Sequence, residues 1–229
     1  MTTQPDIAAV AVLIGERARV AMLDALVDER DLPASELARR AGVSPSTASA
    51  HLGKLVDAGL IGVEHRGRQR RYRLAGPPVA AAIEALAAIA PPAPVHSLRE
   101  ATRGELLRRG RTCYDHLAGR LGVELAVALR RGRFLRGRDS GYLLTRRGEQ
   151  VLTELGIDVA ALRGQRRAFA FPCLDWSERR PHLAGALGAA LAERLFALEW
   201  VERVGPGRAA ALTERGRREL RKRIELDLR

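Results

Sequence analysis

The chain has 229 residues, 46% of them hydrophobic and only 4% aromatic, and its formal net charge is +12. This length allows one large domain or two small ones around a core of Leu, Val and Ala, and the basic charge favours nucleic acid over membrane as the partner. Two cysteines exclude a disulfide framework, and no secretory signal or apolar run of the roughly 20 residues that span a bilayer is present, so we expect a cytoplasmic protein.

Three helices are predicted at the N-terminus. Residues 7–14 and 16–28 form two apolar patterns separated by Gly15, and a short helix over residues 33–41 is stopped by Gly42. The next helix follows at once, which predicts a helix-turn-helix.

The helix after Gly42 has a clear start and two distinct faces. Ser44 caps it, Pro45 fits its first turn, and the apolar residues from Ala48 to Val56 recur with helical spacing. Its outer face carries short polar or small side chains, which can approach base edges in the major groove. The residues that we expect to bind DNA there are Ser44, Ser46, Thr47, Ser49, Ala50, His51 and Lys54.

Residues 60–75 predict a two-stranded wing that follows this helix. Apolar and polar residues alternate along both strands, and four arginines cluster at the tip. We expect the guanidinium groups to bind DNA phosphates, although a merely solvated charged turn would have the same composition. These arginines are Arg66, Arg68, Arg70 and Arg71.

Two apolar helices flank this DNA-reading region, at residues 7–14 and 78–90. They carry more apolar surface than so small a region can cover, so we expect them to form a homodimer interface. A dimer would place two reading helices about one DNA turn (~34 Å) apart, as a palindromic double-stranded operator requires.

Residues 7–90 resemble the winged-helix domain of the ArsR/SmtB family of bacterial repressors. The residues that carry the resemblance are ELARRAGVSPSTASAHLGKLVDAGLI and the wing GVEHRGRQRRYRL. The resemblance implies a dimer, binding to a specific operator, and release by an inducer. The helix over residues 33–41 lacks the cysteines of the family's metal sensors, and residues 79–89 lack the Asp and His ligands of its zinc sensors.

A Pro-rich linker over residues 91–96 precedes a region that contains an internal repeat. Residues 116–129 and 182–195 share nine identities in fourteen positions, and an LTxRG sequence follows each copy. Each copy predicts a helix, a hairpin and a second helix, which is the back half of a winged helix. The region also resembles the YdfF-like branch of the same family, which carries an RTCYDHLAG motif.

We therefore predict a mainly α fold with small β-hairpin wings. A winged helix-turn-helix domain for DNA binding and dimerisation occupies residues 1–90, and two diverged winged-helix-like repeats occupy about 113–160 and 173–229 of a C-terminal region over 97–229. The glycines of the repeated helices could allow close helix packing or border a ligand pocket.

A Cys-x-Asp sequence and a histidine recur in both repeats. Cys113 and His116 are three residues apart and are expected to share a helix face, whereas a loop separates Cys173 from His182. The candidate effector or thiol residues are Cys113, Asp115, His116, Cys173, Asp175 and His182. Three interpretations stay open: buried structural residues, a thiol or inducer sensor, and a tetrahedral zinc-type site if the repeats pack around a pseudo-twofold axis.

No catalytic motif is found, so we expect no enzyme and no required cofactor, with a metal ion as a possibility. The expected function is a sequence-specific, dimeric transcriptional repressor whose inducer is unknown. The alternatives are a non-specific nucleic-acid-binding protein and an enzyme built on the C-terminal repeats.

Overall fold

The computed structural model describes residues 4–28, 31–67, 69–91, 94–95, 97–138, 141–205 and 207–228. Arg68, His96 and residues 92–93 of the expected linker lie outside this set. The chain divides into two compact units, Met1–Ile83 and Glu84–Arg229, so the division falls inside a helix. The expected limits at residues 90 and 97 stay a prediction.

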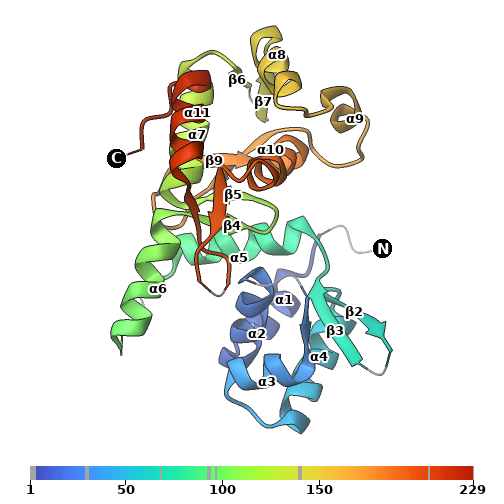
Figure 1. Cartoon of the computed structure of the whole chain (residues 1–229). Coiled ribbons are helices and arrows are strands. Elements are labelled where there is room, and N and C mark those ends of the chain that lie inside the picture. Colours follow the sequence, from blue (N-terminus) through green and yellow to red (C-terminus); the bar gives the residue numbers. More distant parts are fainter. Residues whose placement is uncertain are drawn as a thin grey trace. The chain divides into compact units, whose positions relative to one another are not determined.

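The first unit is a winged helix-turn-helix, as predicted (Figure 1). Its elements are α1 (Ile7–Ile14), α2 (Arg17–Asp28), β1 (Leu32–Pro33), α3 (Ala34–Ala41), α4 (Pro45–Asp57), β2 (Ile61–Arg66), β3 (Gln69–Leu74) and the start of α5 (Pro77–Ile89). The three strands form one antiparallel sheet in the order β1-β3-β2. The short β1, which the sequence pattern does not predict, fixes the base of the wing through the pair Leu32–Tyr72.

Side chains from α2, α3 and α4 form the core of this unit. Leu26, Leu37, Leu52 and Leu55 are each no more than 1% exposed. Gly42 ends α3 with φ +66°, a left-handed conformation in which an amino acid with a Cβ is strained. The tight turn at this glycine sets the direction in which α4 leaves α3.

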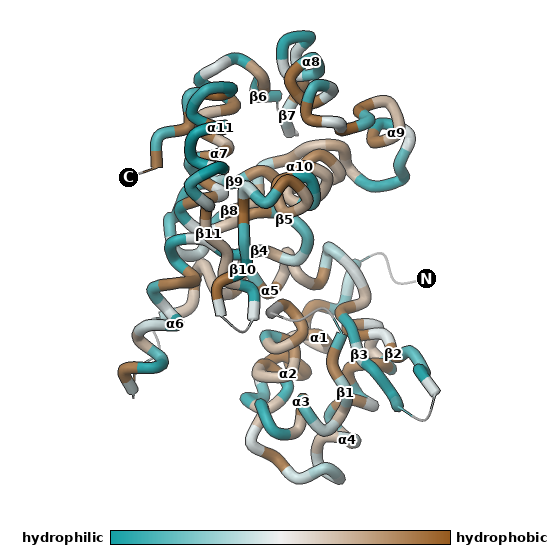
Figure 2. The backbone as a smooth tube through the Cα atoms, viewed as in Figure 1, coloured by the Kyte–Doolittle hydropathy of each residue, from teal (hydrophilic) through white to brown (hydrophobic). Residues whose placement is uncertain are grey.

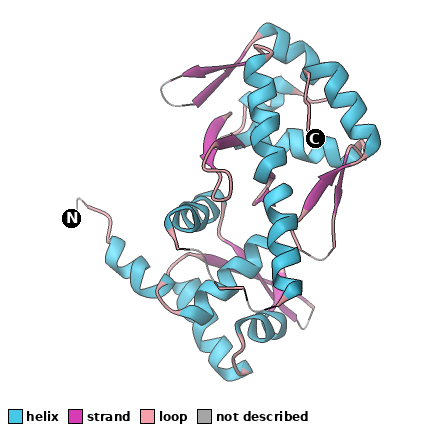
Figure 3. Ribbon diagram, turned by 90° about the vertical axis from the view of Figure 1, so that its left-hand side faces the viewer, coloured by secondary structure: helices cyan, strands magenta, loops and turns pink. Residues whose placement is uncertain are grey.

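The second unit contains paired hairpins and helices (Figure 3). After the end of α5 and α6 (Leu98–Arg109) come β4 (Arg111–Cys113), β5 (His116–Ala118), α7 (Gly119–Arg131), β6 (Leu135–Arg138), β7 (Gly141–Leu144), α8 (Arg146–Glu154) and α9 (Val159–Arg163). They are followed by β8 (Phe171–Leu174), β9 (Pro181–Ala184), α10 (Gly185–Ala197), β10 (Val201–Arg203), β11 (Ala210–Leu212) and α11 (Glu214–Ile224).

The same succession of hairpin, helix, hairpin and helix occurs twice in this unit, and the two copies contact each other reciprocally. Helix α7 packs on β9 of the second copy, and α10 packs on β5 of the first. The N–H of Tyr142 donates to the carbonyl of Ala170 just before β8, and the N–H of Ala210 donates to the carbonyl of Gly110 just before β4. The first hairpin of each copy therefore adjoins the second hairpin of the other.

The repeated LTxRG sequence has the same structural role in both copies. Thr145 and Thr213 are the N-caps of α8 and α11, and their side chains accept hydrogen bonds from Gly148 N and Gly216 N at 3.1 and 3.0 Å. A Cβ on either glycine would collide with a backbone carbonyl, of Phe134 in the first copy and of Trp200 in the second. The motif thus seats the last helix of each copy against its hairpin.

The repeated helices begin later than expected. Residues 116–118 and 182–184 are strands, so Cys113 and His116 do not share a helix face but are paired across the β4–β5 hairpin. The helical sequence pattern therefore runs past the true start of each helix, into the strand that precedes it. Gly119 and Gly185 (φ +69° and +90°) mark the change from strand to helix in the two copies.

Helix α6 is absent from the sequence-based prediction because none of its residues is buried, so it shows no apolar stripe. The sequence does indicate where α6 begins, because Ser-x-x-Glu at residues 97–100 is a capping-box pattern. In the structure the Ser97 side chain accepts a hydrogen bond from Glu100 N at 3.1 Å. Among the described residues no helix combines the length and apolarity needed to cross a bilayer.

We expect Gly216→Ala to destabilise the second unit, since the new methyl group would displace α11 from the Trp200 carbonyl. The matched control is Gly104→Ala in α6, where no atom lies within 4 Å of the added Cβ. That change should instead raise the free energy of unfolding by up to about 1 kcal/mol. Urea unfolding measures the free energy of unfolding of both variants. Equal changes in the two variants would contradict this role for Gly216.

Candidate DNA-binding surface and cysteine–histidine cluster

Helix α4 has a buried apolar face and an exposed face of small side chains. Ala48, Leu52 and Leu55 are buried and Val56 is half-buried, as the pattern predicts. The exposed residues of α4 and its cap include Ser44, Ser46, Thr47, Ser49, Ala50 and Lys54. No branched apolar or acidic side chain lies among these six, so the surface suits close approach to base edges.

Ser44 holds the start of α4 in place. Its Oγ accepts a hydrogen bond from Thr47 N at 3.2 Å and lies 2.8 Å from the Thr47 hydroxyl and 2.9 Å from that of Ser46. The three hydroxyls thus form a cluster at the N-terminus of the helix, where the helix dipole favours an anion such as a DNA phosphate.

His51 differs from its expected neighbours because its ring is directed at α2. The His51 Nδ1 lies 3.3 Å from the guanidinium of Arg19, and its Nε2 lies 3.6 Å from Glu16. Arg19 is buried and also donates to the carbonyls of Val12 and Leu13. The sequence pattern places His51 at the edge of the outer face, but its position one turn from the buried Ala48 and Leu55 lets its side chain reach the neighbouring helix instead.

The wing arginines fall into two groups. Arg71 is largely covered, donating to the Asp31 carbonyl at 2.6 Å and lying 2.8 Å from its carboxylate, so it ties β3 to the segment before β1. Arg66 is more exposed and lies 3.2 Å from the same carboxylate. The Arg70 backbone is paired with His65 in the wing, but its exposed side chain makes no hydrogen bond or ion pair with the described residues. Arg70 is therefore the described wing arginine best placed to bind a phosphate.

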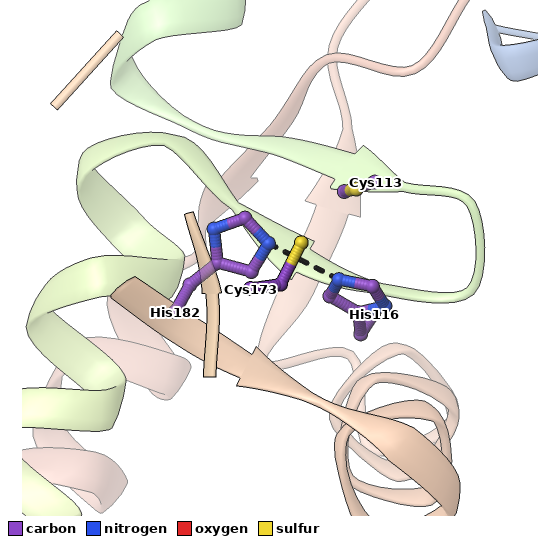
Figure 4. Close-up of side chains that lie close together, drawn as sticks. All are labelled: Cys113, His116, Cys173 and His182. Atoms are coloured by element: carbon purple, nitrogen blue, oxygen red, sulfur yellow. Dashed lines mark hydrogen bonds between the residues drawn. The ribbon is translucent and has the colours of Figure 1, made fainter. Parts of the chain in front are cut away.

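The second unit brings together four of the predicted effector residues. Cys113 is paired with His116 across the β4–β5 hairpin, and Cys173 is paired with His182 across the β8–β9 hairpin. The two sulfurs and one nitrogen from each ring all lie within 4.8 Å of one another, with only Cys173 partly exposed. Figure 4 shows the Cys173 sulfur between the two imidazoles, which face each other.

The two histidines meet through their Nε2 atoms, which are 3.1 Å apart. On the opposite side of each ring stands a carboxylate: His116 Nδ1 lies 3.2 Å from Asp115, and His182 Nδ1 lies 3.1 Å from Asp175. The His182 contact lacks the angle of a well-formed hydrogen bond, so it is an electrostatic contact at short range. Both aspartates of the repeated Cys-x-Asp sequence thus orient the histidine of their own hairpin.

Asp175 is fully buried and connects the two copies. It accepts hydrogen bonds from Gly119 N at 2.7 Å and from Arg111 at 3.1 Å, both from the first copy. Although burial alone raises the pKa of a carboxyl group, the contacts with His182 and Arg111 hold the pKa of Asp175 well below its ordinary value. Asp175 is therefore a carboxylate at neutral pH.

The two thiols have opposite acidities. The hydrogen bond with Cys173, together with burial, raises the pKa of Cys113, whereas the same bond lowers the pKa of Cys173. Burial opposes the shift at Cys173, and the nearby His116 and His182 reinforce it. Cys173, the more accessible of the two, is thus the thiolate of the pair.

Two glycines in the repeated helices make room for this cluster. A Cβ on Gly122 would lie 3.5 Å from the Cβ of His182, and one on Gly188 would lie 3.2 Å from the Cβ of His116. Each would also collide with a backbone carbonyl of its own copy. The glycines therefore allow close packing of helix on hairpin, which is one of the two roles left open by the sequence.

Comparisons with known proteins give matches to the helix-turn-helix region and to the whole chain. Residues 14–64 match a family model described as a helix-turn-helix domain. The chain is also similar to BigR, a transcriptional repressor from Xylella fastidiosa (25% identity over 38% of this chain and 89% of that one, TM-score 0.35). It is similar to a homodimeric winged helix-turn-helix domain from Mycobacterium bovis as well (28% identity, 38% of this chain and 86% of that one, TM-score 0.33).

A curated relative matches almost the whole chain. It is YdfF of Bacillus subtilis, described as an uncharacterized HTH-type transcriptional regulator, with 44% identity over 98% of this chain and 99% of its own length. This match confirms the resemblance to the YdfF-like branch, including its C-terminal region. The chain therefore belongs to the YdfF family of HTH-type transcriptional regulators.

Proposed function

We propose that this regulator is a repressor that binds a palindromic operator as a homodimer and is released by an inducer acting on the second unit. The observation that carries the proposal is the exposed face of α4, which presents hydroxyls, methyl groups and one lysine beside a basic wing. A helix with this surface can contact base edges directly, whereas charge alone would supply only non-specific affinity.

In this proposal α4 recognises the DNA bases and the wing binds the DNA phosphate backbone. Ser46, Thr47, Ser49 and Lys54 contact bases, and Ser44 orients the first turn. Arg70 contacts a phosphate, with Arg66 as its neighbour, while Arg71 supports the wing through Asp31. Arg68 retains its sequence-based assignment, and His51 acts through Arg19 and Glu16 instead of touching DNA.

Dimerisation through α1 and α5 is supported by their exposed apolar side chains. Helix α1 has no buried residue, and its side chains Ile7 and Val12 are 76% and 73% exposed. Figure 2 shows α1 as hydrophobic over its length. In α5, Leu86 and Ile89 are 43% and 77% exposed. A second copy of the chain, presenting the same surfaces, would cover them.

The two copies in the second unit are interpreted as diverged winged-helix units that have taken on a different role. Each contains a helix, a hairpin and a capped helix in the order found in the back half of a winged helix. Their repeated helices α7 and α10 are largely buried, which leaves them no face for a DNA groove. An inducer site in this unit is consistent with the way the two copies bring Cys113 and Cys173 together.

We expect Lys54→Ala and Ser49→Ala to relax operator choice. A duplex selected from a random pool by the wild-type protein and a shuffled duplex should then bind with more nearly equal affinity, since direct base contacts are lost. Fluorescence anisotropy measures both affinities. Equal binding of the two duplexes by the wild-type protein would instead identify a non-specific nucleic-acid binder.

The wing variant Arg70→Ala should weaken binding to both duplexes alike. Loss of one phosphate contact should also reduce the slope of log affinity against log salt by about one. A change in sequence preference with an unaltered salt slope would show that the roles of α4 and the wing are assigned wrongly.

Replacement of Val12 by Glu should convert the dimer to monomer, because it places a charge in the apolar α1 surface. The control is Leu98→Glu at the start of α6, where the leucine is 88% exposed and lies outside the proposed interface. Sedimentation velocity distinguishes the two states, and an unchanged dimer in Val12→Glu would exclude α1 from the interface.

A further inference from the structure

We propose that Cys113, His116, Cys173 and His182 bind one divalent ion of the zinc class in a tetrahedral site, to which each copy contributes one thiolate and one imidazole. This goes beyond DNA binding, because the site lies wholly in the second unit and uses none of the residues of α4 or the wing. It is also separate from the helices in which the ArsR/SmtB resemblance would place a metal.

The spacing of the donor atoms is close to that of a filled site. Nitrogens bound to a tetrahedral ion at about 2.0–2.1 Å lie about 3.3 Å apart, and sulfurs bound at about 2.3 Å lie about 3.8 Å apart. The two Nε2 atoms are 3.1 Å apart, and no pair of donor atoms in the cluster is separated by more than 4.8 Å. Shifts of about 1 Å or less would therefore complete the tetrahedron.

The orientation of the histidines also suits a cation. The carboxylates of Asp115 and Asp175 lie 3.2 and 3.1 Å from the Nδ1 atoms, so the Nε2 atoms point toward the centre of the cluster. The two Nε2 atoms face each other at 3.1 Å, near the spacing of two nitrogens bound to one tetrahedral ion. Carboxylate behind the ring and metal in front is the usual arrangement of a metal-binding histidine.

The charges around the site are compatible with a divalent ion. Two thiolates and one divalent ion make a neutral centre. The charged groups that surround it are also balanced, with three cations and three anions: Arg111, Arg167 and Arg208 with Glu84, Asp115 and Asp175. A neutral centre within a balanced and largely buried shell avoids the cost of an isolated charge in a low-dielectric interior.

The donor set identifies the class of ion. Two sulfurs and two imidazole nitrogens suit zinc and exclude Mg²⁺ and Ca²⁺, which require oxygen ligands. All four positions are occupied by protein, which leaves none for a substrate. The site is therefore structural or regulatory, and partly exposed Cys173 marks the side on which an ion would enter.

Cobalt(II) is the probe for this site. Reduced, metal-free full-length protein should bind one Co²⁺ per chain, with the intense visible bands of a tetrahedral ion and a near-ultraviolet thiolate-to-cobalt band. Zn²⁺ should displace it and abolish both. A folded, reduced wild-type protein that gives only the weak spectrum of octahedral cobalt would falsify the proposal. This test uses neither variants nor DNA, so it does not depend on the DNA-binding proposal.

Variants assign the ligands. Cys113→Ser and Cys173→Ser should each weaken the thiolate-to-cobalt band, and Asp115→Asn, which removes a positioning residue, should lower affinity by roughly 10–100-fold while the tetrahedral spectrum persists. The control is His65→Gln, since His65 is an exposed histidine on β2 in the first unit. Wild-type spectra from the double cysteine variant would overturn the assignment. Lys54→Ala should bind cobalt normally, so failure of DNA reading and failure of metal binding are distinguishable.

Removal of the ion should loosen the second unit. Because the ligands come from two hairpins in different copies, the ion cross-links them, and its binding free energy adds to the stability of the fold. We expect a chelator with reductant to lower Tm and excess Zn²⁺ to restore it. The response should be lost in the double variant Cys113→Ser/Cys173→Ser, and a Tm that is insensitive to chelator in zinc-loaded wild type would contradict the cross-link.

Discussion

The buried carboxylate of Asp175 is the contact on which the second unit depends. It accepts from the backbone of Gly119 and from the buried Arg111 in one copy, and it stands behind His182 in the other. An unpaired buried charge is costly, so these partners must all be present together. The same carboxylate therefore fixes the start of α7, neutralises Arg111 and orients one ring of the histidine pair.

Much of the first unit could be predicted because its signals are local. Ser44, Pro45 and the apolar spacing from Ala48 to Val56 specify α4 without reference to the rest of the chain. The positions of His51 and Arg71 could not be predicted in this way. Both side chains are engaged by partners distant in sequence, Arg19 and Asp31, and periodicity carries no information about such partners.

In the second unit the sequence predicts the cysteine–histidine cluster only as one of three alternatives. The repeat of Cys-x-Asp and His shows that two sets of donors exist, but convergence depends on how the copies pack. The prediction of a helix at His116 is wrong because the strand there has three residues, too few to show an alternation of apolar and polar side chains. The sequence signal for this boundary is Gly119, which ends the strand and begins the helix with a φ of +69°.

The reciprocal contacts between the two copies have a consequence for their origin. The hairpin before α7 adjoins the last strand of the other copy, and the hairpin before α10 adjoins β7 of the first. In a single copy the backbone groups that make these contacts would lack their partners, so an ancestral chain with one copy would gain them by associating with a second. Gene duplication and fusion of such a pair would turn a symmetric assembly into one polypeptide, and the longer loop between Cys173 and His182 would then be free to diverge on one side only.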